Sequence, residues 1–245
     1  MMRILVTNDD GITSVGLIEL ARAAKELGEV WVVAPAAQCS AMSQRISVFG
    51  EMILKHETDF PVEGVHAYSI TGTPADCVKV ALMNVMPEAP DVVFSGINNG
   101  YNVGIGIMYS GTIGAAKEAL VRGIPAIAFS NTMNGAFEII REKLVPIAKD
   151  LLTRPIGKYE LWNVNFPGCT LKDYKGILED RRPEGKSYYT TEFVPTENPD
   201  GTITLAVTGD PCLEAGEGSD TLAVVNNYIS IGKVRSGVLE DGVFE

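Results

Sequence analysis

The feature that most constrains this chain is an alternation of short β-branched runs with helical patterns over residues 3–165. Arg3–Asn8 and Val30–Val33 have the composition of buried strands, and the segment 15–27 between them places its leucines and alanines on one helical face. A strand, a helix and a second strand in this order form a βαβ unit, whose two strands lie parallel in one sheet. The sequence therefore predicts an α/β fold with a mostly parallel sheet.

The same alternation continues along the chain and then changes. Further strands are expected at 67–71, 91–95, 126–129 and 161–165, and further helices at 112–122 and 138–152 and after Thr73. Beyond Pro167 the chain is more polar, and two β-rich runs at 189–194 and 202–207 flank the turn signal Asn198–Gly201. We therefore predict a core of residues 1–167 and a C-terminal extension of residues 168–245 that carries a β-hairpin and helps to complete the core.

Charge and hydropathy exclude several classes of protein. The chain has 20 lysines and arginines against 31 aspartates and glutamates, a net charge of −11. This charge disfavours a partner of long nucleic acid, because such binding neutralises phosphates with basic side chains. The apolar run Ile4–Val6 is too short for a signal peptide, and no apolar run approaches the roughly 18 residues of a membrane span. We therefore expect a cytoplasmic protein with no membrane partner.

The histidine content narrows the metal chemistry. His56 and His66 are the only 2 histidines in the sequence, so a three-histidine zinc site is impossible. The 4 cysteines contain no Cys-x-x-Cys spacing, which argues against a structural zinc site. A metal site in this chain should therefore be rich in oxygen ligands, of the magnesium, manganese or calcium kind.

Two adjacent carboxylates follow the first predicted strand. In an open parallel sheet, ligands bind at the carboxyl ends of the strands, where Asp9 and Asp10 are expected to lie. If both are partly buried, their mutual repulsion is of order 4 kcal/mol at about 4 Å and an effective dielectric near 20, and a divalent cation would relieve it. The alternative is an Asx turn at Asp10–Gly11 with both acids in water.

Polar residues also follow one later strand and open one helix. Asn98 comes after the strand at 91–95, and its side-chain oxygen suits a hard cation. Ser110, Gly111 and Thr112 enter a predicted helix, whose N–H groups and positive dipole end favour an anion such as phosphate. The alternative for Ser110 or Thr112 is an ordinary helix N-cap.

Several segments in order along the chain match the motifs of one known family. They read ILVTNDDG (4–11), GTPADCV (72–78), SGINNGYNVG (95–104), YSGTIGAA (109–116) and GIPAIA (123–128). Weaker matches are NVNFP (163–167) and YISI (228–231). Through these segments, which together span nearly the whole chain, the sequence resembles the SurE (survival protein E) family of metal-dependent 5′/3′-nucleotidases.

The resemblance implies a fold and a set of site residues. It implies a Rossmann-like, three-layer α/β/α core and one divalent cation per subunit, Mg²⁺ or Mn²⁺. The cation ligands would be the side chains of Asp9, Asp10, Ser40 and Asn98, and the phosphate would be bound by Asn102, Ser110, Gly111 and Thr112.

The resemblance also implies a reaction and an assembly. The reaction is hydrolysis of nucleoside 5′- or 3′-monophosphates to nucleoside and phosphate, with short polyphosphate as a further substrate of some members. We interpret a metal-bound water as the nucleophile, oriented or deprotonated by Asp9. The C-terminal hairpin and tail would exchange between subunits of a homodimer or homotetramer.

Departures from the family pattern leave alternatives open. Many members read Asp-Arg-x-x-Ser-Gly where this chain has Ala36–Ala41, so an acid and a base beside Ser40 are lost and the substrate preference is open. Thr13–Val15 stands where members often have His-Ala-Pro. The alternatives to a nucleotidase are a nucleotide-sensing protein without significant turnover and a short-chain exopolyphosphatase.

Overall fold

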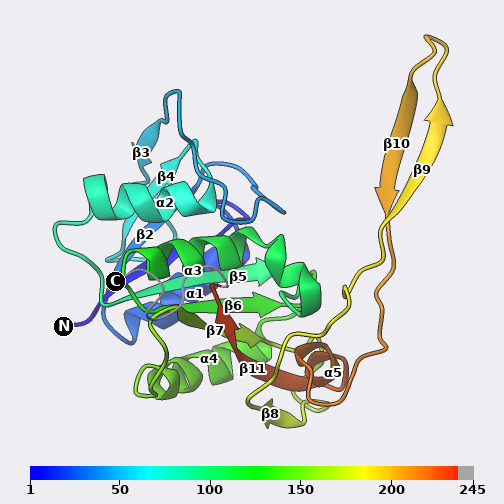
Figure 1. The fold of residues 1–245 in the computed structure, drawn as a ribbon. Helices are drawn as coiled ribbons and strands as arrows, with labels where there is room; N and C mark the ends of the chain where they lie inside the picture. The colour runs from blue at the N-terminus through cyan, green and yellow to red at the C-terminus, as the bar shows by residue number, and fades with distance from the viewer. Residues whose placement is uncertain (237–245) are drawn as a thin grey trace, which may run out of the picture.

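A nine-stranded sheet runs through the computed structural model of the chain, which describes residues 1–236 (Figure 1). The strand order is β3-β4-β2-β1-β5-β6-β7-β11-β8. The strands from β4 to β7 in this order are parallel, whereas β3 pairs antiparallel with β4 and β11 pairs antiparallel with β7. The predicted mostly parallel sheet is therefore confirmed.

The strands of the sheet are β1 (Arg3–Thr7), β2 (Glu29–Pro35), β3 (Leu54–His56), β4 (His66–Ile70), β5 (Val92–Asn99), β6 (Ala126–Asn131), β7 (Glu160–Asn165), β8 (Gly176–Leu178) and β11 (Tyr228–Arg235). The α-helices are α1 (Val15–Lys25), α2 (Pro74–Val80), α3 (Gly111–Val121), α4 (Glu138–Leu151) and α5 (Asp220–Val225). A π-helical turn, η1 (Ala81–Val85), extends α2, and a 3₁₀ turn, η2 (Gly104–Met108), precedes α3.

Helices cover both faces of the sheet. Side chains alternate along β1, so Ile4 and Val6 join one buried cluster with α1 and α4, while Leu5 joins a second cluster with α2 and α3. This alternation explains why the strands are apolar at nearly every position, because both of their faces are buried. The result is the predicted three-layer α/β/α core (Figure 1).

The order of strands reverses beside β1. From β1 the chain builds the sheet outward through β2 to β4 in one direction, and from β5 through β6 to β7 in the other. The carboxyl ends of β1 and β5 therefore border the crevice at a topological switch point, where open α/β sheets bind their ligands.

One part of the C-terminal region belongs to the sheet, and another part projects away from it. β11 and β8 join the sheet beside β7, and α5 packs on β11. The antiparallel hairpin of β9 (Glu192–Glu197) and β10 (Ile203–Thr208) projects away from the core (Figure 1). Both hairpin strands were predicted. The division at residue 167 stays a prediction, and residues 237–245 of the predicted extension lie outside the described residues.

A few local elements differ from the sequence expectation. The strand expected at 91–95 is longer and reaches Asn99 as β5, and β3 was not predicted. β8 and the π-helical turn η1 were not predicted. Within residues 1–236, none of the helices combines the length and the hydropathy needed to cross a membrane.

Candidate functional site

The turn that follows β1 is fastened to the start of α1 by a buried asparagine. Nδ2 of Asn8 donates to the carbonyl oxygen of Gly11 at 3.0 Å and to the hydroxyl of Ser14 at 2.7 Å. The Ser14 hydroxyl also accepts from the backbone N–H of Leu17 and so caps α1. This network fixes the backbone on which Asp9 and Asp10 stand.

Asp9 is buried against the N-terminus of α3, with 4% of its surface exposed. Its Oδ1 accepts a 2.6 Å hydrogen bond from the hydroxyl of Thr112. A Cβ atom at Gly111 would lie 2.9 Å from Oδ2 of Asp9, so only a glycine permits this close approach of helix and carboxylate. The backbone oxygen of Asp9 accepts from the N–H of Cys39, which joins the turn to the loop after β2.

Burial raises the pKa of both carboxyl groups. It raises the pKa of Asp9 to about 6, against the hydrogen bond from Thr112 and with a further rise from the charge of Asp10. Burial also raises the pKa of Asp10, and the hydrogen bond from the backbone N–H of Asn99 opposes the rise. Two adjacent carboxylates in a partly desolvated crevice are thus held at an electrostatic cost that a bound cation would relieve.

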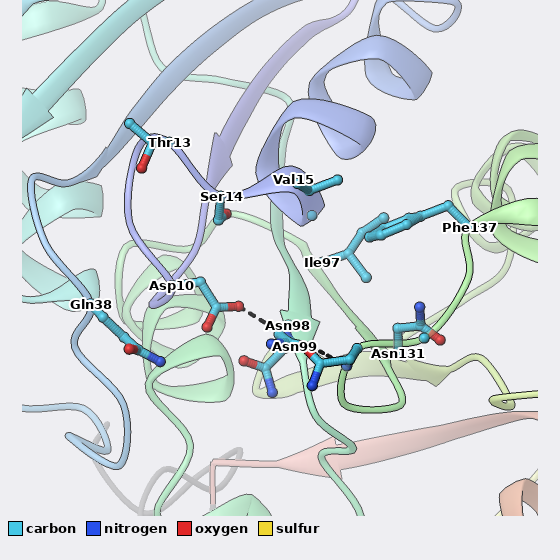
Figure 2. Close-up of a pocket in the computed structure, with 13 residues that line it drawn as sticks. Asp10, Thr13, Ser14, Val15, Gln38, Ile97, Asn98, Asn99, Asn131 and Phe137 are labelled. Atoms are coloured by element: carbon cyan, nitrogen blue, oxygen red, sulfur yellow. Dashed lines mark hydrogen bonds between the residues drawn. The ribbon is translucent and has the colours of Figure 1, made fainter.

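Asp10 and Asn98 line one pocket of about 570 Å³ at the carboxyl ends of β1 and β5. Oδ2 of Asp10 accepts from the N–H of Asn99 at 2.9 Å, so the carboxylate is directed toward the end of β5 (Figure 2). Nδ2 of Asn98 donates to the carbonyl oxygen of Gly100, which orients its amide and leaves Oδ1 as an acceptor. The structure therefore brings Asp10 and Asn98 together.

Ser40 lies on the loop after β2 and is exposed. Its hydroxyl accepts from Nε2 of Gln38 at 3.0 Å, and Gln38 itself lines the pocket with Asp10. Within residues 1–236, no hydrogen bond links the Ser40 side chain to either aspartate. Its connection to the site runs through the neighbouring residue, Cys39, which bonds to Asp9.

Asn102 is buried, with 5% of its surface exposed, and is held from both sides. Its Nδ2 donates to the hydroxyl of Ser130 at 2.8 Å, and its backbone oxygen accepts from the side-chain amides of Asn163 and Asn165. Oδ1 of Asn165 accepts in turn from the backbone N–H of Asn102. These contacts fix the loop between β5 and η2.

The start of α3 has the geometry of a capped helix. The hydroxyl of Ser110 accepts from the backbone N–H of Ile113 at 3.1 Å, which is the N-cap arrangement considered as an alternative from the sequence. The hydroxyl of Thr112 donates to Asp9 and is therefore already engaged. The contribution of this helix end to anion binding would come from its backbone N–H groups and its dipole.

The sequence analysis missed a buried acid, Asp220, from the C-terminal region. It contacts Gly104, where the loop that carries Asn102 enters η2. Oδ2 of Asp220 accepts from the backbone N–H of Gly104 at 3.0 Å, and Oδ1 accepts from that of Glu184 at 3.0 Å. Asp220 is the first residue of α5 and is 3% exposed. The Ser219–Asp220 pair is also an ordinary helix start, so nothing in the sequence separates this role from capping.

The donor set is compatible with a hard divalent cation. Asp9 and Asp10 supply adjacent carboxylates, and Asn98 supplies a neutral amide oxygen, all ligand types that Mg²⁺ and Mn²⁺ accept. Within the described part of the chain, no three or more histidine, cysteine, aspartate or glutamate side chains are grouped to hold a metal. A cation here would therefore depend on neutral oxygens and water beside the two acids.

Matches to known proteins extend over nearly the whole chain. The family model described as survival protein SurE matches residues 4–186. A protein of Cytophaga hutchinsonii named 5′-nucleotidase SurE is 40% identical over 93% of this chain and 88% of its own length. A Thermus thermophilus protein named 5′-nucleotidase SurE 1 is 37% identical over 100% of this chain and 96% of its own length.

A solved structure agrees with the fold. The crystal structure of the SurE protein from Aquifex aeolicus superposes with a TM-score of 0.80 at 36% sequence identity, covering 95% of this chain and 93% of that one. The matches in sequence and in structure extend over the core and most of the C-terminal region. The chain therefore belongs to the SurE family.

Proposed function

We propose that this chain is a metal-dependent phosphomonoesterase that hydrolyses nucleoside monophosphates to nucleoside and phosphate. The proposal is supported by the family and by relatives named 5′-nucleotidase SurE. The observation that carries it is the buried Asp9 carboxylate, held against the N-terminus of α3 beside Asp10 at the switch point of the sheet. A carboxylate held at a helix N-terminus beside a second carboxylate suits a cation and a phosphate bound side by side.

The residues that would hold the cation are Asp9, Asp10, Ser40 and Asn98. Mg²⁺ or Mn²⁺, one per subunit, fits two carboxylates supplemented by neutral oxygens. When bound, a divalent cation polarises a phosphoryl oxygen and lowers the pKa of a coordinated water. Ser40 is exposed and its hydroxyl accepts from Nε2 of Gln38, so its oxygen would be shared between Gln38 and the cation.

Groups of the protein itself would position the phosphate ester, accept a proton and stabilise negative charge. Asp9, fixed by the Thr112 hydroxyl, would orient the attacking water and accept its proton. The backbone N–H groups at Gly111 and Thr112, with the Ser110 turn, would stabilise negative charge on the phosphate. Asn102 would contact the phosphate through the second hydrogen of Nδ2, since the first is donated to the hydroxyl of Ser130.

The hairpin is proposed as the oligomerisation element of a homodimer or homotetramer. Phe193, Leu205 and Val207 of β9 and β10 are exposed at 61%, 56% and 68%, and a two-stranded hairpin of this kind is marginal by itself. Burying these side chains against another subunit would stabilise it. A cytoplasmic location stays a prediction from the sequence.

The test is phosphate release from nucleoside 5′- and 3′-monophosphates and tripolyphosphate, with Mg²⁺ or Mn²⁺ and again with chelator. Release from nucleotides that chelator abolishes is the expected result. A preference for tripolyphosphate would instead identify an exopolyphosphatase. Nucleotide binding without release under any metal would identify a sensor.

A further inference from the structure

The pocket beside Asp10 extends well beyond the candidate cation site. Its volume of about 570 Å³ is in the range of small-molecule sites, and it is larger than a phosphate needs. Asp10 and Asn98 lie on its wall, so whatever occupies the rest of the pocket lies next to two of the proposed cation ligands. For an ester substrate, that neighbour is the alcohol from which the phosphate is cleaved.

One side of the pocket is apolar and includes an aromatic ring. Val15 at the start of α1, Ile97 of β5 and Phe137 just before α4 all line it. Figure 2 shows the Phe137 side chain extending toward Ile97. An aromatic face of this kind stacks well on a flat, unsaturated ring such as a nucleobase.

The polar part of the lining consists mostly of amides, and several are already fixed. The Asn131 amide donates to the carbonyl oxygen of Ala136 and accepts from the N–H of Thr132. Oδ1 of Asn99 accepts from the backbone N–H of Asn134 at 2.7 Å. These bonds hold the 131–137 loop against the end of β5 and leave Nδ2 of Asn99 as a donor toward the pocket.

The residues that line the pocket carry little charge. Asp10 is the only charged side chain among the residues that line the pocket. A chain of further phosphates would meet an apolar wall and no lysine, arginine or histidine among the lining residues, which is unfavourable. The pocket therefore suits an uncharged leaving group with a planar, hydrogen-bonding ring.

We propose that this pocket is the nucleoside subsite of the enzyme and that Phe137 determines the preference for a base-bearing substrate by stacking on the base. The inference rests on the proposed function, because it assumes that a phosphate ester binds beside Asp10. It adds the residue that distinguishes a nucleotide from a sugar phosphate or a polyphosphate.

The test compares adenosine 5′-monophosphate with ribose 5-phosphate, which keeps the ester and the sugar and lacks the base. For the wild type, kcat/KM is expected to be higher for the nucleotide. In F137A, the ratio of the two kcat/KM values should fall about tenfold, mainly through the KM of the nucleotide, in line with the loss of one stacked base. F137L keeps apolar bulk without the flat face and should lower the same ratio.

A matched control lies in the same loop. Met133 is 55% exposed and does not line the pocket, so M133A should keep the wild-type ratio. Phe137 also packs against the core, so thermal unfolding of each variant is measured, and F137L decides the question if F137A does not fold. A ratio within twofold of the wild type in a folded F137A or F137L overturns the proposal.

Direct binding separates this inference from the proposed function. Adenosine, which has no phosphate, is titrated into the metal-free wild type and F137L by calorimetry. Binding that F137L weakens supports the subsite even if neither phosphate ester is hydrolysed, in which case the proposed function alone fails. Hydrolysis of both esters with no adenosine binding and an unchanged ratio in F137L would retain the function and refute the subsite.

Discussion

The hydroxyl of Thr112 donates a 2.6 Å hydrogen bond to Oδ1 of Asp9, joining two buried residues 103 positions apart in the chain. The bond connects the first turn of α3 to the end of β1. It lowers the pKa of Asp9 against the rise caused by burial. Thr112 therefore acts on Asp9 as a positioning residue, because it fixes the direction of the carboxylate that the proposed cation would bind.

Replacing Thr112 by valine should weaken cation binding without unfolding the protein. T112V keeps the shape of the side chain and removes the hydroxyl, so the carboxylate loses its orienting partner. Loss of such a partner costs about 10- to 100-fold in metal affinity or activity. Activity is measured as a function of Mn²⁺ concentration. T112S, which restores the hydroxyl, should recover most of the affinity, and equal Mn²⁺ dependence in T112V and wild type would refute the role.

Replacing Asp9 by asparagine should remove most phosphate release while the fold persists. The D9N side chain has nearly the same shape but lacks one ligand charge and the proton-accepting oxygen, so we expect a loss of at least about 100-fold. Asp59 is exposed, and D59N serves as the control for removing one carboxylate elsewhere. Turnover in D9N near that of D59N, at saturating Mg²⁺ or Mn²⁺, would remove Asp9 from the catalytic assignment.

Much of the candidate site follows from strand endings. Asp9 and Asp10 come directly after a buried strand, and Asn98 falls at the end of the next strand in the sheet, so their proximity follows from the parallel arrangement. The bond from Thr112 to Asp9 was not predictable, since it depends on how α3 packs. Asp220 reaches Gly104 across 116 positions, and no local pattern encodes a contact of that range.

The same holds for the fold: elements with a local sequence pattern were predicted, whereas short strands and the pairing of distant strands were not. The strands and helices with strong apolar periodicity, such as β1, α1 and α4, were predicted within a few residues. β3 and β8 have three residues each and few buried side chains, so they carry no periodic signal. The antiparallel pairing of β11 with β7 is decided by the path of the chain, because the alternation of side chains is the same in either direction.

Removing the carboxylate of Asp220 should destabilise the loop that carries Asn102. In D220A the buried N–H of Gly104 loses its acceptor, which costs about 2 kcal/mol in the free energy of unfolding. D220N retains one acceptor oxygen and should lose less. Urea unfolding measures both, and the KM for the nucleotide should rise in D220A. Equal stability of D220A and wild type would show that the loop is held by other contacts.

The hydrogen bonds of Asp76 predict that the stability of the protein depends on pH. Its carboxylate accepts from the N–H and hydroxyl of Ser47 and from the N–H of Thr73, which caps α2. Burial raises the pKa of Asp76, but these hydrogen bonds outweigh it and hold the pKa below the ordinary value of 3.8. A lowered folded-state pKa stabilises the protein above the unfolded-state pKa, and this stabilisation is lost as the pH falls through the folded-state value.

The matched variant for this effect is D76N. At pH 7 it should unfold with a free energy about 1–2 kcal/mol below that of the wild type, because the amide is a weaker acceptor for three donors. The difference should shrink as the pH falls below 3.8, where the wild-type carboxyl group becomes protonated. Urea unfolding between pH 7 and pH 3 gives both values. A difference that does not change over this range would contradict the assigned role of the charge.

One face of the hairpin is mostly apolar and the other is mostly polar, with Val194 and Ala206 opposed on the polar face. Directly opposed residues share a face, so Phe193 and Val207 lie on the same side as Pro195 and Leu205, while Thr204 and Thr196 lie on the other. The apolar side chains are exposed at 56–68% for Leu205, Phe193 and Val207. An exposed apolar face on a projecting hairpin marks an interaction surface.

A charge on the apolar face of the hairpin should dissociate the oligomer. In L205E a carboxylate would be buried in the proposed subunit contact without a partner, which is costly, whereas T204E places the same charge on the polar face of the same strand. Light scattering after size exclusion should therefore give a lower mass for L205E and the wild-type mass for T204E. If L205E and wild type have the same mass above that of one chain, the subunit contact lies elsewhere. A wild type with the mass of a single chain would refute the proposed assembly.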